Sequence, residues 1–377
     1  MGWGRAAAVG TAVVLMAGGA AGCTGGTGAK GDGGSPSGAA KPSVPPPPPL
    51  VIAQADAEKV FGRFEWERRT PAGWKGTDAT SQVATGPLLA EWKAKASIRT
   101  LRNTPGTEPD STGLVNPSFV IPAERDQPSY PRYFVVFSKA NGWENGPATA
   151  VHYFQQEAPG GEWKAAVETW VAMEAPAPLE STSVSRFAWT TVQLRPTPVA
   201  AAGRDAAGAA VLSPTAEADR AVCGRFADYT SFTTPDEPES DAFAPGPLTG
   251  EMVAKLAAKA KEPELKNLLT YTFEHEVSGP ALPVLKTAGG SSLVACPLTR
   301  TQKTRGKEST VTFTFGEGSD DSALLGAKDK KWRSADAKQS LTALIELPAA
   351  ASPGPAQVVA CNCLDPQLLE ITGKRAG

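Results

Sequence analysis

Apolar residues follow a helical spacing in two similar segments of the chain. The sequence "ADAEKVFGRF" (residues 55–64) and the sequence "EADRAVCGRF" (residues 217–226) each place small and apolar side chains at intervals of three and four. This spacing predicts an amphipathic helix in each segment. A Pro/Gly-bearing loop and a second helix are expected after each, the second helix starting near Gly86-Pro87 or Gly246-Pro247, because proline is favoured just inside a helix start.

Short runs of β-branched and aromatic residues, bounded by turn residues, follow the helices in both halves and predict strands. Turns at Ala158-Pro159-Gly160-Gly161 and in "AAASPGP" are expected to close hairpins. The expected strands are Ser118–Pro122, Arg132–Lys139, Thr149–Gln156 and Glu162–Met173, then Tyr271–Val277, Leu293–Gln302, Thr310–Phe315, Leu341–Leu347 and Gln357–Leu364.

The two halves resemble each other closely enough to indicate a duplication. Val60–Phe64 matches Val222–Phe226, and "ATGPLLAEWKAK" from Ala84 matches "APGPLTGEMVAK" from Ala244, at nearly equal separations. Helices followed by hairpin-connected strands indicate an α+β fold. We therefore expect two tandem duplicated domains, 51–195 and 216–377, each with N-terminal helices packed on a curved antiparallel sheet, joined by a small-residue linker, 196–215.

This order of elements resembles the nuclear-transport-factor-two-like (SnoaL-like) cone. In that family helices pack against a curved sheet around a pocket, and some members use a His or Asp in the pocket as a general base. The resemblance implies a cone-shaped cavity in each half.

The first residues have the pattern of an export signal. A short stretch with Arg5 precedes an apolar small-residue segment that ends in Ala20-Ala21-Gly22 before Cys23, and small residues of this kind precede cleavage sites. The position of Cys23 resembles the lipobox of bacterial lipoproteins, although Ala20 stands where Leu is commonest. The resemblance implies a signal peptide over 1–22, cleavage before Cys23, and a diacylglyceryl group on its thiol. An ordinary signal peptide is the alternative.

Residues 23–50 are rich in Gly, Ser and Pro and end in a five-proline run. Such a segment is expected to be a disordered tether, because it has too little apolar surface to fold. The layout resembles actinobacterial cell-surface lipoproteins with a domain of unknown function. It predicts a protein lipid-anchored through Cys23 on the extracytoplasmic face of the cell membrane, with an envelope protein or a cell-wall component as its partner.

Charge and composition remove several functional classes. The formal net charge is −2 and the isoelectric point about 5.9, which lacks the basic character of a nucleic-acid-binding protein. Only two histidines occur, His152 and His275. The sequence contains no nucleophile elbow, Walker loop, Ser-x-x-Lys or His-Glu-x-x-His motif. We therefore expect no cofactor, no metal and no enzyme activity.

The four cysteines after Cys23 all lie in the second half: Cys223, Cys296, Cys361 and Cys363. An even number in an exported domain predicts two disulfides. Residues two apart on a strand point to one face and diverge, which disfavours a bond between Cys361 and Cys363. We expect Cys223 and Cys296 each to pair with one member of that pair, and regard a redox centre or a soft-metal site as less favoured alternatives.

Three residues of the first half are candidates for a ligand or partner surface. His152 is the best single catalytic candidate, although it has no identified partner. Trp163 and Trp170 lie an odd number of residues apart, which places them on opposite faces of a regular strand. One of them would then be available to a ligand or partner, unless both fill the core.

These observations favour a non-catalytic binding or scaffold module at the cell envelope. The alternative is a protein that binds a small apolar ligand or a cell-wall component in a cone-shaped pocket. An enzyme that uses His152 is a third and less favoured hypothesis.

Overall fold

The structure is a computed structural model, and it describes residues 48–69, 77–102, 113–141, 148–174, 195–261, 268–326 and 330–376. The predicted signal peptide, Cys23 and nearly all of the predicted tether lie outside these ranges. Residues 47–377 form one compact unit. Within the described residues, no helix is long and apolar enough to cross a membrane.

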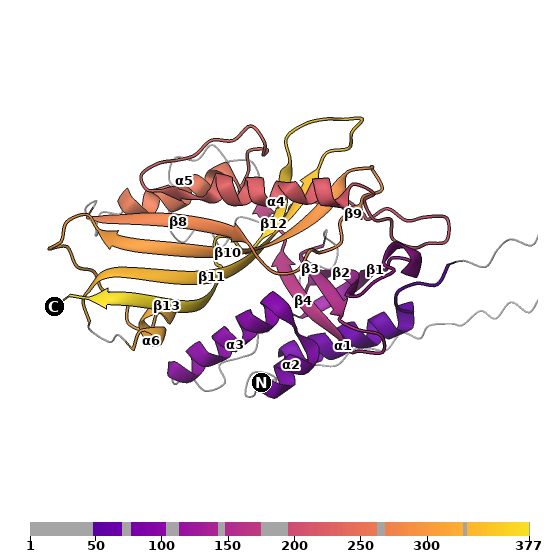
Figure 1. Cartoon of the computed structure of the whole chain (residues 1–377), viewed down its shortest axis with the longest axis horizontal. Coiled ribbons are helices and arrows are strands. Elements are labelled where there is room, and N and C mark those ends of the chain that lie inside the picture. The colour runs from indigo at the N-terminus through magenta and orange to yellow at the C-terminus, as the bar shows by residue number, and fades with distance from the viewer. Residues whose placement is uncertain are drawn as a thin grey trace, which may run out of the picture. The chain divides into compact units, whose positions relative to one another are not determined.

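The first half of the unit places helices on a four-stranded antiparallel meander of order β1-β2-β3-β4 (Figure 1). Pro87 lies in the first turn of α3, as the sequence predicted. The elements are α1 (Gln54–Arg69), α2 (Thr77–Val83), α3 (Gly86–Leu101), β1 (Leu114–Val120), the 3₁₀ turn η1 (Glu124–Asp126), β2 (Arg132–Ala140), β3 (Ala150–Gln156), β4 (Trp163–Trp170), β5 (Met173–Glu174) and β6 (Arg195–Pro196).

The second half builds a larger antiparallel sheet of order β12-β11-β10-β8-β7, in which β13 also pairs with β11 and β9 with β10. The helix α4 lies along β8 and β10 (Figure 1). The elements are α4 (Ala216–Thr230), β7 (Phe232–Thr233), α5 (Gly250–Ala258), η3 (Lys259–Lys261), β8 (Leu269–Val277), β9 (Leu285–Lys286), β10 (Ser292–Gly306), α6 (Asp320–Leu324), β11 (Trp332–Leu347), β12 (Gln357–Cys361) and β13 (Gln367–Arg375).

The first sheet is buried on both faces. Along β2, Phe134 and Val136 pack with the helices α1 and α3, whereas Tyr133 and Val135 point to the opposite face. Successive strand residues point to opposite sides, so these neighbours enter two different cores. The second of these cores contains side chains from both sheets, including Leu293, Leu344 and Val359. The unit therefore has four layers: the helices of the first half, the first sheet, the second sheet and the helices of the second half.

Backbone and side-chain hydrogen bonds join the two sheets where β4 ends. The Ala172 N–H donates to the Val359 carbonyl at 2.9 Å, and Val171 forms an isolated bridge with Ala360. The buried Thr169 hydroxyl donates to the Thr342 carbonyl at 2.7 Å. The segment 196–215, predicted as a linker, also packs against both halves through bridges from Ala210 to Pro122 and from Leu212 to Leu285.

Each predicted strand except Thr310–Phe315 overlaps a strand of the structure, whereas the short strands β6, β7 and β9 and the first half of β11 were not predicted. The segment Thr310–Phe315 contributes a single bridge, Phe313 to Trp332, rather than a strand. β13 was not predicted, because its outer half, Thr372–Arg375, is polar and exposed. The α+β class and the curved antiparallel sheets are confirmed, and the duplication stays a prediction.

The structure corrects the predicted disulfide pairing. Cys223 on α4 bonds to Cys296 on β10, with 5.3 Å between their Cα atoms, and Cys361 bonds to Cys363. β12 ends at Cys361 and the chain turns at once. Cys363 is therefore not a strand neighbour of Cys361, and the two Cα atoms approach to 5.1 Å, closer than the roughly 6.6 Å of residues two apart on a strand.

The two disulfides are expected to stabilise the protein unequally. Cys223–Cys296 spans 73 residues and Cys361–Cys363 spans two. In the chain-entropy account they restrict the unfolded chain by about 4 and about 1.5 kcal/mol respectively. Urea unfolding of the Cys223→Ala/Cys296→Ala and Cys361→Ala/Cys363→Ala double variants should therefore show the larger loss for the first pair, and equal losses would contradict this reasoning.

The two buried threonines at the sheet contact provide a matched pair of substitutions. Thr169→Val removes the hydroxyl that donates to the Thr342 carbonyl, and we expect the free energy of unfolding to fall by about 1–2 kcal/mol. The Thr342 hydroxyl is buried without a hydrogen-bond partner, so Thr342→Val should be neutral or stabilising. Chemical denaturation of both variants measures this, and a larger loss in Thr342→Val would refute the assignment.

Candidate functional site

A cavity of about 630 Å³ lies where α1, α3 and β4 of the first half meet α6, β11 and the β12–β13 turn of the second half. Ten of its seventeen lining residues are charged or polar, which distinguishes it from the three apolar cores. The lining residues are Arg68, Leu88, Glu91, Trp92, Lys95, Glu168, Trp170, Asp320, Asp321, Gln339, Cys361, Asn362, Leu364, Asp365, Pro366, Gln367 and Leu368.

One face of α3 contributes four of these residues, Leu88, Glu91, Trp92 and Lys95. Residues three and four apart in a helix lie on the same face, one above the other. Leu88 and Trp92 are buried in the core beneath the cavity, and the Trp92 ring stacks on Phe64 at a centroid distance of 5.6 Å. Glu91 and Lys95 therefore carry charge on a face that is otherwise packed against the core.

A β-bulge on β4 decides where the two candidate tryptophans point. Tyr153 pairs with Val167 and Phe154 pairs with Ala165, so Ala166 is an additional residue in the strand. This residue reverses the alternation, and Trp163 and Trp170 both pack against the core of the first half. The expectation of opposite faces was therefore wrong. Only Trp170 lines the cavity.

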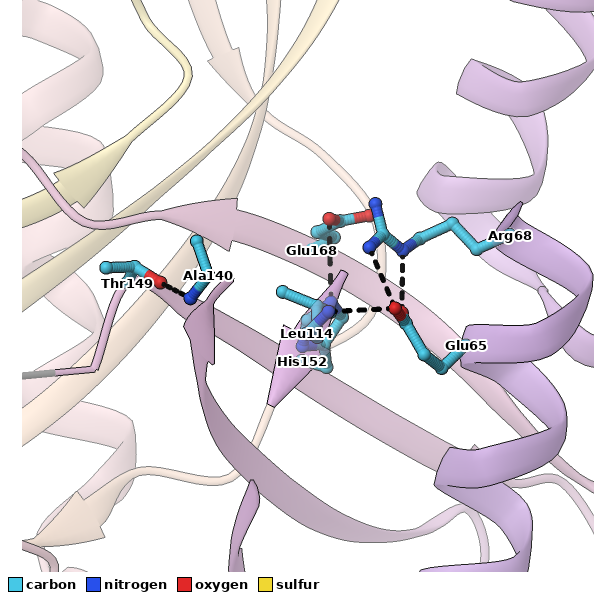
Figure 2. A network of polar contacts seen from close by, with 7 residues as sticks. All are labelled: Glu65, Arg68, Leu114, Ala140, Thr149, His152 and Glu168. Carbon is cyan, nitrogen blue, oxygen red and sulfur yellow. Dashed lines mark hydrogen bonds and ion pairs between the residues drawn. The ribbon is translucent and has the colours of Figure 1, made fainter. Parts of the chain in front are cut away.

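His152 is fully buried beneath the cavity rather than placed at a surface. Its Nε2 lies 3.5 Å from Oε1 of Glu168, its cross-strand neighbour (Figure 2). The rings of Phe61 and Phe64 stand against the imidazole at centroid distances of 5.9 and 5.1 Å. His152 does not line the cavity, and it contacts the cavity wall through Glu168.

Burial by itself would raise the pKa of Glu168, yet the pKa lies below its ordinary value. The hydrogen-bonding and charge interactions with His152 lower it, and the cations Arg68 and Lys95 lower it further. Opposite charges nearby favour the ionised form of a carboxyl group. Glu168 is therefore held as a carboxylate in the cavity wall.

Arg68 is anchored by Glu65 on the preceding turn of α1. Its Nε and Nη2 donate to the two carboxylate oxygens at 3.0 and 3.3 Å, and the Leu114 N–H donates to Oε1 of the same carboxylate at 2.8 Å (Figure 2). A carboxylate that accepts from both a guanidinium and a backbone amide fixes the guanidinium in place. Arg68 thus stays at the cavity wall with little rotational freedom.

The segment "VACNCLDP" forms the opposite wall, which contains Cys361, Asn362 and Asp365. The Asn362 side chain accepts from the Thr342 N–H at 2.7 Å. The buried Arg300 donates from Nη1 to the Cys363 carbonyl at 3.0 Å. Together with the Cys361–Cys363 disulfide, these bonds hold the turn in one conformation.

Arg300 also sets the position of Gln339, another lining residue, by donating to its Oε1 from Nε at 2.7 Å. Burial lowers the pKa of Arg300 to about 10, and the Asp365 carboxylate opposes that change. The guanidinium remains charged at neutral pH. It therefore compensates part of the negative charge that Asp365 brings to the cavity.

Glu91 differs from Glu168 in its electrostatic surroundings. Burial raises its pKa to about 7; a hydrogen bond from Ser340 and the charge of Lys95 oppose the rise, and the charge of Glu168 adds to it. The Ser340 hydroxyl donates to Oε1 at 2.7 Å. Among the described residues, this is the only hydrogen bond that Glu91 accepts. Near neutral pH its carboxyl group is therefore partly protonated.

Two aspartates of α6 complete the wall. Asp320 pairs at 2.7 Å with Arg102, the C-cap residue of α3, and this ion pair joins the two halves at the cavity. Burial raises the pKa of Asp321, and the neighbouring Asp320 charge raises it further. The described residues contain no group of three or more His, Cys, Asp or Glu arranged to hold a metal ion. The site can offer hydrogen-bond acceptors, negative charge and indole rings.

Of the residues proposed from the sequence, the structure places Trp170 and Cys361 at the cavity. Cys363 and His152 stand behind its wall, and Trp163 packs on Phe134 elsewhere, at a ring-centroid distance of 5.0 Å. The sequence reasoning missed Glu91, Glu168 and Lys95. The pattern Leu88-x-x-Glu91-Trp92-x-x-Lys95 was the available signal, since it sets two charges on the apolar face of a helix.

A family model described as a domain of unknown function (DUF8094) matches residues 50–364, which is most of the chain and spans both sheets and the cavity. Neither the curated proteins nor the solved structures contain a match to the sequence.

The raised pKa of Glu91 predicts a pH dependence of stability. The folded state binds this proton more tightly than the unfolded state does, so its contribution is present below pH 4.5 and is lost as pH rises through about 7. Relative to Glu91→Gln, the wild-type free energy of unfolding should fall by about 2 kcal/mol between pH 5 and pH 8. Urea unfolding at several pH values measures the difference.

The exposed Glu370, which lies 3.9 Å from Lys338, is the matched control. Glu370→Gln should leave the wild-type pH dependence unchanged. If Glu91→Gln also leaves it unchanged, the placement of Glu91 in the cavity wall is wrong.

Proposed function

The chain belongs to the DUF8094 family, whose description assigns no activity, and we propose that it is a membrane-anchored, extracytoplasmic lipoprotein that binds a small polar ligand in the cavity between its two halves. The observation that carries the binding proposal is the lining itself. Charged and amide side chains surround an accessible space together with Trp170, and ligand sites are concave and place a few polar groups around apolar and aromatic surface.

The construction of the walls supports a binding role. Arg68 is held by Glu65, Glu168 is held as a carboxylate beside His152, and the 361–365 turn is held by Arg300. Side chains that are positioned before a ligand arrives lose little conformational entropy when it binds. The lining therefore favours a polar ligand over the small apolar ligand that the cone-fold resemblance suggested.

The envelope location rests on the sequence before residue 48. The small residues Ala20-Ala21-Gly22 before Cys23 resemble a lipobox, and two acyl chains on one cysteine meet the two-anchor requirement for stable membrane attachment. The Gly/Ser/Pro-rich residues 23–50 would hold the folded unit away from the bilayer. An actinobacterial envelope, with a wall component or envelope protein as the source of the ligand, fits this layout.

We also propose that the two halves arose by duplication and that each half resembles the cone fold. Val60–Phe64 and Val222–Phe226 each lie in a helix, α1 and α4, that packs on one sheet. This equivalence supports an origin by tandem duplication. In both halves helices lie on one face of an antiparallel sheet, as in the cone fold. The cavity lies between the halves, so the proposal needs the two copies joined.

Both parts of the proposal can be tested with the full chain. Labelling with radioactive palmitate in the native host should mark the wild type and Cys363→Ala, but not Cys23→Ala. After solubilisation in detergent, native mass spectrometry should detect a small molecule bound to the wild type. Trp170→Ala should reduce its occupancy at least tenfold, because the indole forms part of the cavity wall.

Trp66→Ala is the matched control, since Trp66 is 61% exposed on α1 and lies outside the cavity. It should retain the bound molecule. Equal occupancy in the two tryptophan variants, or no bound molecule in the wild type, would count against binding in this cavity. Label on Cys23→Ala would count against the anchor.

A further inference from the structure

The charge in the cavity wall is unbalanced. Five carboxyl groups, Glu91, Glu168, Asp320, Asp321 and Asp365, face two cationic side chains, Arg68 and Lys95. Each carboxyl group has a cationic neighbour: Asp320 has Arg102, Asp365 has Arg300 and Asp321 has Lys259. Glu91 and Glu168 share Lys95, and Glu168 also interacts with Arg68, which pairs with Glu65. Within the lining itself the carboxyl groups still outnumber the cations, and Glu91 and Glu168 have one lysine between them.

Glu91 has hydrogen-bonding capacity that the described residues do not use. Only its Oε1 has a partner, the Ser340 hydroxyl. Its Oε2 accepts no hydrogen bond from the described residues, and burial is the main cause of the rise of the Glu91 pKa to about 7. A positively charged N–H donor would give Oε2 of Glu91 a hydrogen bond, and its charge would favour the ionised form of the carboxyl group.

Aromatic surface lies in the same wall. Trp92 stands on the same helical face as Glu91, and Trp170 follows Glu168 by two residues on β4. Indole rings attract cations through their negative faces. Carboxylates and indoles together are the groups that recognise ammonium and guanidinium ions, whereas an anionic ligand would meet an excess of negative charge.

We propose that the cavity binds a small organic cation, an ammonium or guanidinium compound, with its charged group between Glu91 and Glu168 and its carbon chain against Trp170. This inference rests on the proposed binding function and names the chemical class of the ligand. The five carboxyl groups and the indoles supply recognition, and Arg68 keeps Glu168 ionised.

Four-carbon probes of different charge provide the test. Putrescine and agmatine carry cationic groups, 1,4-butanediol is a neutral analogue, and succinate is a dianion. Isothermal titration calorimetry of the detergent-solubilised full chain in 150 mM NaCl should give putrescine or agmatine an affinity at least tenfold above that of butanediol and succinate. Glucose serves as a neutral polyhydroxylated probe.

Glu91→Gln keeps the size and the Ser340 acceptor but removes the charge. It should weaken putrescine binding at least tenfold, while Glu370→Gln, a surface substitution, should not. The charged groups that line the cavity with Glu91 are Lys95 on the same helix and Arg68, Glu168, Asp320, Asp321 and Asp365 on other elements. Wild-type affinity should be about tenfold weaker at pH 6 than at pH 8, because the proton on Glu91 must leave, and Glu91→Gln should lose this dependence.

Three other outcomes would overturn the inference that the ligand is a small organic cation. Preferential binding of glucose or succinate would overturn the cationic class and leave the proposed binding function standing. Equal loss in Glu91→Gln and Glu370→Gln would assign putrescine to the general acidic surface instead of the cavity. Binding of none of the probes also overturns the inference, and the native mass spectrometry of the Trp170 and Trp66 variants then decides the binding function separately.

Discussion

The packing of the first sheet between two cores is the constraint on which the rest of the structure depends. Phe134 and Phe154 point toward α1 and α3, and their neighbours Val135 and Tyr153 point toward the second sheet. Burial of both faces removes far more apolar surface from water than a sheet with one solvated face could. It also fixes the register of β2 and β3, because a shift of one residue would exchange every side chain between the two cores.

The cavity begins where the contact between the two sheets stops, at the end of β4. The sheets join through Thr169, Ala172 and their partners on β11 and β12. Beyond this contact the wall is formed by α3 and the 361–365 turn, which carry charged and amide side chains in place of apolar ones. These polar groups are fixed by neighbours in both halves: Asp320 by Arg102, Glu91 by Ser340. The site therefore exists only in the assembled unit.

Local patterns were sufficient for most of the elements. Apolar spacing located α1 and α4, and β-branched and aromatic runs located β2, β3, β8 and β10. The sequence patterns gave wrong side-chain directions where the two-residue alternation of a strand is interrupted. The bulge at Ala166 turned Trp163 and Trp170 to one face, and the end of β12 at Cys361 brought Cys363 within bonding distance. An additional residue or a strand end leaves no mark in a two-residue period, so neither could be predicted from spacing.

The sequence by itself determined the α+β class, the helices α1, α3, α4 and α5 and most of the longer strands, because these depend on interactions between residues close in the chain. It also contains the export-type N-terminus, the even number of cysteines and the scarcity of histidine. Tertiary structure alone decided which cysteines pair, that His152 is buried against Glu168, and that Glu91 and "VACNCLDP" face one cavity. These outcomes depend on residues up to about 270 positions apart, and a contact at that separation is set by the packing of whole layers, which no local pattern encodes.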